Sequence, residues 1–272
     1  MNATERLQRT TGLGRVGFAK NPAGQTVLTT LHQAGAAKFR LPAVYGSEHA
    51  EAVMINTAGG LTDGDLLETD VTVQAGADAV VTTQACERIY RAASDEPARI
   101  LNSLSVSGGA KLAWLPQETI LFDGGRVVRS TSVELSDDAD FLGVESLILG
   151  RESMGEAVKT GALRDHWRIR RGERLIFADG FSLNGDVGQT IDRLALLSGY
   201  RYLSTIICCR ANLDSVLEAV RQALAEAGAA SVFGDKLIAR IACDSGPHLR
   251  EVLGRVLGIL MDGRPLPRVW NV

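Results

Sequence analysis

Residues 56–91 read NTAGGLTDGDLLETDVTVQAGADAVVTTQACERIYR, and this stretch decides the fold. It opens with two tight turns, at Ala58-Gly59-Gly60 and at residues 62–65, because glycine accepts positive φ and aspartate hydrogen-bonds its own backbone. In residues 67–74 apolar and polar side chains alternate, which is typical of a half-buried strand. After a turn at Ala75-Gly76-Ala77, residues 79–83 predict a second strand. The short connection favours a hairpin between the two.

The acids of this stretch allow two interpretations. In the first, the glycines only form turns and the carboxylates are only solvated, as is common in Gly-Asp turns between strands. In the second, Asp63, Asp65, Glu68 and Arg88 gather at one end of the strand pair and form a surface site. The residues alone do not separate the two interpretations.

Length and composition narrow the class of protein. The chain has 272 residues, enough for one large domain or two small ones, and its 5% aromatics and 29 glycines suit many short strands joined by turns. The net charge is −3 and Lys and Arg are dispersed, so neither a nucleic-acid partner nor a polybasic membrane patch is expected. The absence of an apolar run of ~18 residues and of a signal-peptide core predicts a cytoplasmic protein.

Short candidate strands fill most of the chain before residue 200, separated by Gly-rich turn signals. Residues 141–149 are almost all apolar, which predicts a strand buried on both faces. The expected strands are residues 15–19, 26–33, 37–41, 53–56, 67–73, 79–83, 98–106, 111–115, 119–122, 126–135, 141–149, 162–170 and 173–181, the last two as a hairpin turning at Arg171-Gly172.

The last third has a different pattern. Apolar side chains recur at helical spacing in residues 213–224 and 249–260, and Asn212 and Gly228 are the expected N-cap and stop of the first helix. Strands expected at residues 200–208, 231–233 and 236–242 complete a small sheet with two helices on one face. We therefore expect a mainly β protein with a single domain over residues 1–272, β-rich in 14–199 and α+β in 200–272.

Motifs of common active sites do not occur in the sequence. There is no nucleophile elbow, no phosphate-binding loop and no His-Glu-x-x-His. Gly12, Gly14 and Gly17 match a dinucleotide fingerprint, but no predicted strand precedes them and no helix follows, so cofactor binding is not expected. The four histidines lie far apart, and the four cysteines are expected to be small apolar residues rather than metal ligands or disulfide partners.

Carboxylates are the remaining candidates for chemistry. Two of them could serve as the acid and base of a hydrolase, although nothing in the sequence indicates a shifted pKa or a cofactor. They form three sets, which are Asp63, Asp65 and Glu68, then Glu118 and Asp123, then Glu145, Glu152 and Glu156.

Several short motifs follow one another along residues 40–272. They are Asn56-Thr57-Ala58-Gly59-Gly60-Leu61 with Gly64-Asp65, Thr82-Thr83-Gln84 with Ile89-Tyr90-Arg91, Trp114-Leu115-Pro116-Gln117-Glu118, Leu149-Gly150-Arg151 with Gly155-Glu156, Asp165-x-Trp167, and Pro267-Arg268-Val269-Trp270.

In this order, the motifs resemble the urease accessory protein family UreD, also called UreH. The family usually has Pro-Pro-Gly-Gly in the first motif, where this chain has Thr57-Ala58, and a glycine where it has Asp63. The resemblance implies a superhelix of β-strands with a pair of helices. It also implies a non-enzymatic chaperone that binds apo-urease, recruits UreF and the GTPase UreG, and helps to deliver Ni²⁺ while GTP is hydrolysed.

A chaperone of this kind has no tightly bound cofactor, and nickel passes through it transiently. Scattered carboxylates suit a weakly held ion better than a closed His/Cys cage. The expected nickel path consists of Asp63, Asp65, Glu68, Glu145 and Glu156. Two other functions stay open, a carboxylate-dependent hydrolase and a structural β-protein without a metal role. The two C-terminal helices either contribute to the UreF-binding face or only cover the core.

Overall fold

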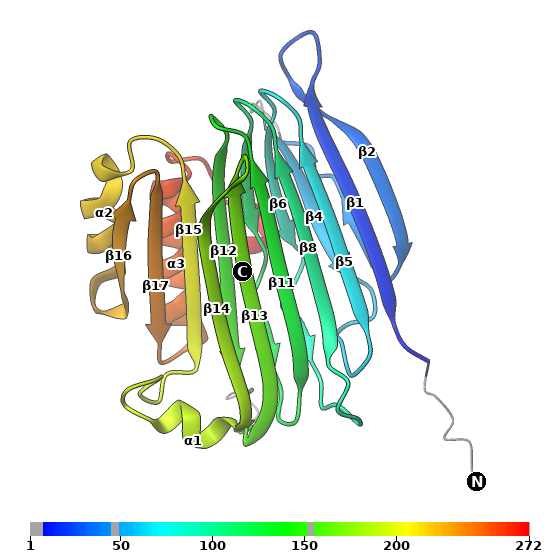
Figure 1. Cartoon of the computed structure of the whole chain (residues 1–272), viewed down its shortest axis with the longest axis vertical. Coiled ribbons are helices and arrows are strands. Elements are labelled where there is room, and N and C mark those ends of the chain that lie inside the picture. Colours follow the sequence, from blue (N-terminus) through cyan, green and yellow to red (C-terminus); the bar gives the residue numbers. More distant parts are fainter. Residues whose placement is uncertain (1–7, 45–48, 152–154, 272) are drawn as a thin grey trace.

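Two long β-sheets dominate the computed structural model, which describes residues 8–44, 49–151 and 155–271 (Figure 1). The first sheet has the strand order β14 (Arg174–Asp186), β13 (Thr160–Arg171), β11 (Arg126–Leu135), β8 (Ala98–Val106), β5 (Leu66–Val73), β1 (Thr11–Lys20) and β2 (Thr26–Gly35). The second has the order β16 (Gly228–Phe233), β17 (Lys236–Cys243), β15 (Tyr202–Cys209), β12 (Asp140–Leu149), β9 (Lys111–Leu115), β6 (Asp78–Thr83), β4 (Ala50–Asn56) and β3 (Ala37–Arg40), with β10 (Thr119–Leu121) and β7 (Glu87–Ile89) beside it.

The chain winds between these sheets as a superhelix. From β4 to β13 it alternates between the second and the first sheet, apart from the short β7 and β10. Strands from successive turns therefore lie side by side and pair in parallel, as β5 does with β8 and β6 with β9. The mainly β, superhelical fold expected from the resemblance is confirmed.

The predicted hairpin of residues 67–73 and 79–83 is wrong. Both strands exist, but β5 pairs with β1 and β8, and β6 pairs with β4 and β9 in the other sheet. A period of two marks a half-buried strand without naming its partner, and the turn at residues 75–77 serves here as a corner between sheets. The second predicted hairpin is confirmed, because β13 and β14 pair antiparallel.

The second sheet is buried on both faces. One face packs against the first sheet around residues such as Phe18, Leu104 and Trp114. The other face packs against the helices through residues such as Val80 and Val144. Strand β12 therefore has buried residues in both phases, which confirms the prediction made for residues 141–149.

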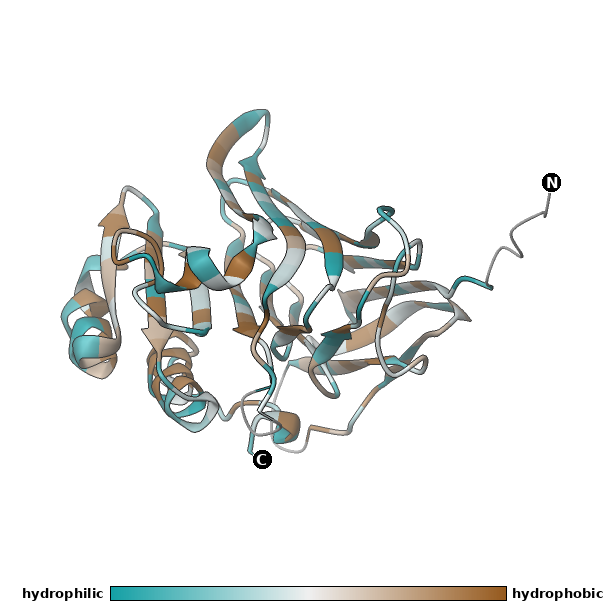
Figure 2. Ribbon diagram, turned by 90° about the horizontal axis from the view of Figure 1, so that it is seen from below, coloured by the Kyte–Doolittle hydropathy of each residue, from teal (hydrophilic) through white to brown (hydrophobic). Residues whose placement is uncertain are grey.

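In the described part of the chain three α-helices accompany the sheets, all of them in the C-terminal third. α2 (Asp214–Leu224) and α3 (Gly246–Leu260) lie on the outer face of the second sheet, where α3 buries Leu249, Val252 and Leu257 (Figure 2). The two helices therefore cover a core, which is one of the two roles that the sequence leaves open for them. The short helix α1 (Val187–Asp192) is not among the elements that the sequence predicts. The Asn212 N-cap is wrong, because the cap of α2 is Leu213 and makes no side-chain hydrogen bond.

The Gly-x-Gly-x-x-Gly motif lies inside strand β1, where it allows close packing. A Cβ atom on Gly14 would lie 2.8 Å from Cε2 of Phe39, and one on Gly12 would lie 2.8 Å from Cδ1 of Leu67. These two glycines let β3 and β5 approach β1, so each has a packing role.

The C-terminal tail packs back on the second sheet. Its 3₁₀ turn at Arg268–Trp270 places the Trp270 indole N–H 3.2 Å from Oγ1 of Thr82 and 3.2 Å from the carbonyl oxygen of Leu115. The side-chain amide of Gln117 also donates to the carbonyl oxygen of Val269. The final motif thus fixes the Trp-Leu-Pro-Gln segment at the end of β9.

Candidate functional site

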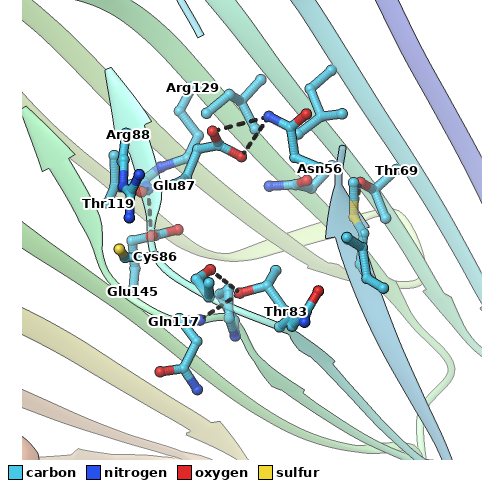
Figure 3. A pocket seen from close by; sticks show the side chains of 18 of the residues that line it. Asn56, Thr69, Thr83, Cys86, Glu87, Arg88, Gln117, Thr119, Arg129 and Glu145 are labelled. Atoms are coloured by element: carbon cyan, nitrogen blue, oxygen red, sulfur yellow. Dashed lines mark hydrogen bonds and ion pairs between the residues drawn. The ribbon is translucent and has the colours of Figure 1, made fainter. Parts of the chain in front are cut away.

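A cavity of about 190 Å³, lined by apolar and polar side chains, lies between the two sheets and is called cavity 1 here (Figure 3). The first sheet contributes Thr69, Asn102 and Arg129 to its wall, and the second contributes Trp114 and Glu145. All five side chains are nearly inaccessible to solvent. Polar groups at these positions are unusual because the neighbouring turns of the superhelix bury apolar residues there.

A buried ion-pair cluster forms the inner end of cavity 1. Arg129 on β11 contacts Asp165 on the neighbouring strand β13 through Nε at 3.1 Å and Nη2 at 2.7 Å. Its Nη1 reaches across to the second sheet, where it lies 2.5 Å from Oε1 of Glu145 and 2.7 Å from Oγ1 of Thr119. One guanidinium therefore joins the two sheets and faces two carboxylates.

Burial and charge shift the pKa values in this cluster. Burial alone would lower the pKa of Arg129, but the charges of Asp165 and Glu145 raise it above its ordinary value. Burial raises the pKa of Glu145; Arg129 opposes this and Asp165 adds to it. Two carboxylates share one cation in a desolvated site, which accounts for the raised pKa of Arg129 and the raised pKa of Glu145.

A second cavity, cavity 2, of about 400 Å³ lies on the other side of the cluster. Its wall includes the aromatic rings of Trp167, Phe181 and Tyr200, and at its rim Arg240 forms an ion pair of 2.7 Å with Asp179. Residues lining both cavities are Arg129 and Glu145. The ion-pair cluster therefore stands where the two cavities meet.

The wall of cavity 1 carries a further carboxylate. Glu87 accepts hydrogen bonds from Nδ2 of Asn56 at 3.0 and 3.1 Å (Figure 3). Burial raises the pKa of Glu87 to about 7, although the hydrogen bonds from Asn56 oppose that shift. Its neighbours Cys86 and Arg88 also line cavity 1, so thiol, carboxylate and guanidinium groups lie together on this wall.

Asp63 lies outside both cavities and is buried under hydrogen bonds. Its carboxylate accepts from Ser94 Oγ at 2.7 Å, Ala93 N at 3.1 Å and Thr62 Oγ1 at 3.0 Å, and it pairs with Arg9 at 2.9 Å. Burial would raise the pKa of Asp63, but these partners together lower it to about 2.

Asp65 is held in a similar way. Its carboxylate accepts from the backbone N–H of Thr10 at 2.7 Å and of Thr62 at 2.8 Å. Two acids predicted for a surface site are therefore engaged in pinning a turn to the N-terminal segment.

The other predicted path residues lie apart from one another. Glu68 is half-buried on β5 and lines neither cavity, and Glu156 forms a 2.6 Å ion pair with Arg151. Glu152 falls outside the described residues. Within residues 8–44, 49–151 and 155–271, no three His, Cys, Asp or Glu side chains are grouped so that they could hold a metal ion. Of the five predicted residues, Glu145 lines a cavity.

Sequence reasoning missed Arg129, although its strand carries the signal. In β11 the buried phase is Val127, Arg129, Thr131, Val133 and Leu135, so a charged side chain occupies an inward position. The same holds for Asp165 in β13 and Glu145 in β12. A charge in the buried phase of each of three strands indicates an internal ionic site.

Fold and site together define a class of protein, a two-sheet β-superhelix with ionic groups buried between its sheets. Among the described helices, none has both the length and the apolar character of a membrane span.

Comparison with known proteins gives the family. The model of the UreD urease accessory protein family matches residues 10–271. The urease accessory protein UreD of Rhizobium etli is 44% identical over 98% of this chain and 97% of its own length. That of Agrobacterium fabrum is 41% identical over 98% and 93%. The chain belongs to the UreD family of urease accessory proteins, and it is a non-catalytic protein of urease maturation.

Proposed function

We propose that this chain is a cytoplasmic scaffold of urease maturation that binds apo-urease and UreF, recruits UreG through UreF, and guides Ni²⁺ through its interior. Family membership supports the maturation role. The observation that carries the nickel route is cavity 1, a space between the sheets whose wall includes the Glu145 carboxylate. No observation favours the hydrolase or the purely structural alternative over this function.

Cavity 1 suits an ion that travels with its water shell. Among described residues of its wall, Trp114 has an indole N–H that donates to no protein atom, although the side chain is 2% exposed. A buried donor next to a space of this size normally binds water. Carboxylate, amide and hydroxyl groups from Glu145, Asn102 and Thr69 offer weak contacts to a hydrated divalent cation.

The proposed route gives Glu145 a direct role. Asp63, Asp65, Glu68 and Glu156 line neither cavity, so a transient nickel contact at these four acids stays a prediction from the sequence. In this proposal nickel is a cargo and not a resident metal.

Partner binding is supported by apolar side chains on the surface. Leu194 is 87% exposed and Leu196 is 57% exposed, both in the connection between α1 and β15. Val27, Leu28 and Leu31 are exposed on the edge strand β2. Apolar groups gathered on a surface are typical of proteins that work in complexes.

The route is tested by filling cavity 1 from its wall. Cys86 is half-buried in its wall, and Cys86→Trp adds the largest side chain there. We expect the variant to assemble with apo-urease and UreF but to transfer little nickel. Cys86→Ser keeps the space open and controls for the thiol. Normal nickel transfer by an assembled Cys86→Trp complex would refute the route while leaving the scaffold role intact.

A further inference from the structure

Two side chains, Arg129 and Glu145, stand where the two cavities meet. Cavity 1 and cavity 2 have Arg129 and Glu145 in common among the residues that line them, and Asp165 completes the cluster from the side of cavity 2. Arg129 is 5% exposed and extends from the first sheet to the second. The space on either side totals several hundred Å³, so the guanidinium separates two roomy compartments.

The contacts of Arg129 divide into an anchor and a latch. The anchor is the side-on pair with Asp165, made by Nε and Nη2 on a strand directly beside β11. The latch is made by Nη1 alone, with Glu145 and Thr119 on the facing sheet. The guanidinium is planar and moves as one rigid group, so Nη1 leaves both latch contacts when the plane tilts about the Nε–Nη2 edge. Asp165 holds that edge through two nitrogens and still neutralises the guanidinium.

The position of this charge has a consequence for a passing cation. A guanidinium is protonated at every physiological pH, and Arg129 repels a divalent ion strongly because its side chain is almost inaccessible to solvent and is poorly screened. A cation that crosses from one cavity to the other must therefore displace Nη1 from Glu145. The released carboxylate then faces the cation in place of the arginine.

We propose that Arg129 is the gate of the nickel route, anchored on Asp165 and latched on Glu145 and Thr119, and that opening the latch joins cavity 1 to cavity 2. The proposal rests on the nickel route of the proposed function. It assigns a role to Arg129, Asp165 and Thr119, which the sequence did not place on that route.

The test uses the full chain assembled with UreF and apo-urease and supplied with a stoichiometric amount of Ni²⁺. The variant Arg129→Met with Asp165→Asn removes the guanidinium and its anchor while keeping Glu145 and similar side-chain volumes. We expect nickel to reach urease several-fold faster than with the unmodified chain, because the cation no longer has to displace a charge. An unchanged or slower rate in an assembled complex would overturn the gate.

A matched control removes an ion pair elsewhere. Arg264 pairs with Asp78 at 2.8 Å, and neither residue lines cavity 1 or cavity 2. Arg264→Met with Asp78→Asn should leave the transfer rate unchanged. An equal acceleration in this control would show a general loosening of the fold and would also overturn the gate.

A milder variant keeps the test decisive if the double variant does not fold. Thr119→Val removes one latch contact and leaves every charge in place. We expect a smaller acceleration of nickel transfer, and an unchanged rate would count against the latch. A failed gate is distinguishable from a failed route, because Cys86→Trp still blocks transfer if the route is right and the gate is wrong.

Discussion

Arg129 and Asp165 are register partners on the parallel strands β11 and β13, and they form a two-point ion pair whose nitrogen–oxygen distances are 3.1 and 2.7 Å. The pair lies between the sheets, where neighbouring inward positions such as Val127 and Leu163 carry apolar residues. The side chains are 6% and 11% exposed, so water screens the pair poorly. With Glu145 added, the cluster is a connection between two sheets and the boundary between two cavities.

The first prediction concerns the stability of this cluster. Arg129→Met alone leaves Glu145 and Asp165 buried without a cation, and we expect a loss of about 3–5 kcal/mol in the free energy of unfolding. The neutral triple variant Arg129→Met, Glu145→Gln, Asp165→Asn should recover most of that loss. Urea unfolding of the three proteins measures this. A triple variant as unstable as the single one would show that shape, rather than charge, holds the cluster.

The second prediction concerns the glycines of β1. Gly14→Ala brings a Cβ within 2.8 Å of the buried Phe39 ring. We expect overpacking to lower the free energy of unfolding by about 1–3 kcal/mol. Gly254→Ala is the matched control, since a methyl group on that helical glycine would have no atom within 4 Å outside its own helix backbone and chain neighbours. The control should gain about 0.5–1 kcal/mol from helix propensity. Thermal unfolding distinguishes the two, and a harmless Gly14→Ala would contradict the packing role.

The third prediction is a pH dependence. The pKa of Glu87 is raised from 4.5 to about 7 in the folded protein, so folding favours its protonated form. Its contribution to stability is full below pH 4.5 and is lost as the pH rises towards 7. Glu87→Gln keeps an acceptor for Asn56 and removes the titration. The unfolding free energy of Glu87→Gln relative to the unmodified chain should rise between those pH values, and a constant difference would contradict the shift.

The fourth prediction concerns the turn acids. Asp63→Ala with Asp65→Ala removes acceptors for backbone and side-chain donors, and we expect a loss of about 1–3 kcal/mol for each carboxylate. Stability and assembly with UreF should therefore fall together with urease activation. Measuring assembly with UreF and urease activation in the same cells decides the role of Asp63 and Asp65. A variant that assembles fully but fails to activate urease would place these acids on the nickel path instead.

Strand positions could be predicted well, whereas strand partners could not. The alternation in residues 67–73 reports which side chains face the core, and β5 has that pattern of burial. Pairing depends on which strand lies one turn away in the superhelix, and no local pattern carries that information. The turn at residues 75–77 would serve a hairpin equally well, so the sequence does not distinguish a hairpin from a corner between sheets.

The candidate site could be predicted only in part, because its residues lie on strands whose partners no local pattern names. Glu145 stands out as a charge in an apolar strand, but Arg129 and Asp165 are spread over two other strands. Their meeting depends on the parallel register between β11 and β13 and on the stacking of the sheets. Asp63 and Asp65 lie close in sequence and so suggest a shared site, yet their hydrogen bonds to Thr10, Ala93 and Ser94 arise only in the folded chain.

The most direct test of the internal nickel route combines a change in the wall of cavity 1 with the change at the Arg129 junction. If nickel crosses cavity 1 and the Arg129 junction in series, Cys86→Trp must remain limiting when the gate is removed. The measurement is the rate at which apo-urease gains nickel in assembled complexes carrying Cys86→Trp together with Arg129→Met and Asp165→Asn. We predict the low rate of Cys86→Trp alone, whereas the fast rate of the gate variant would show that nickel bypasses cavity 1 and would contradict a single internal route.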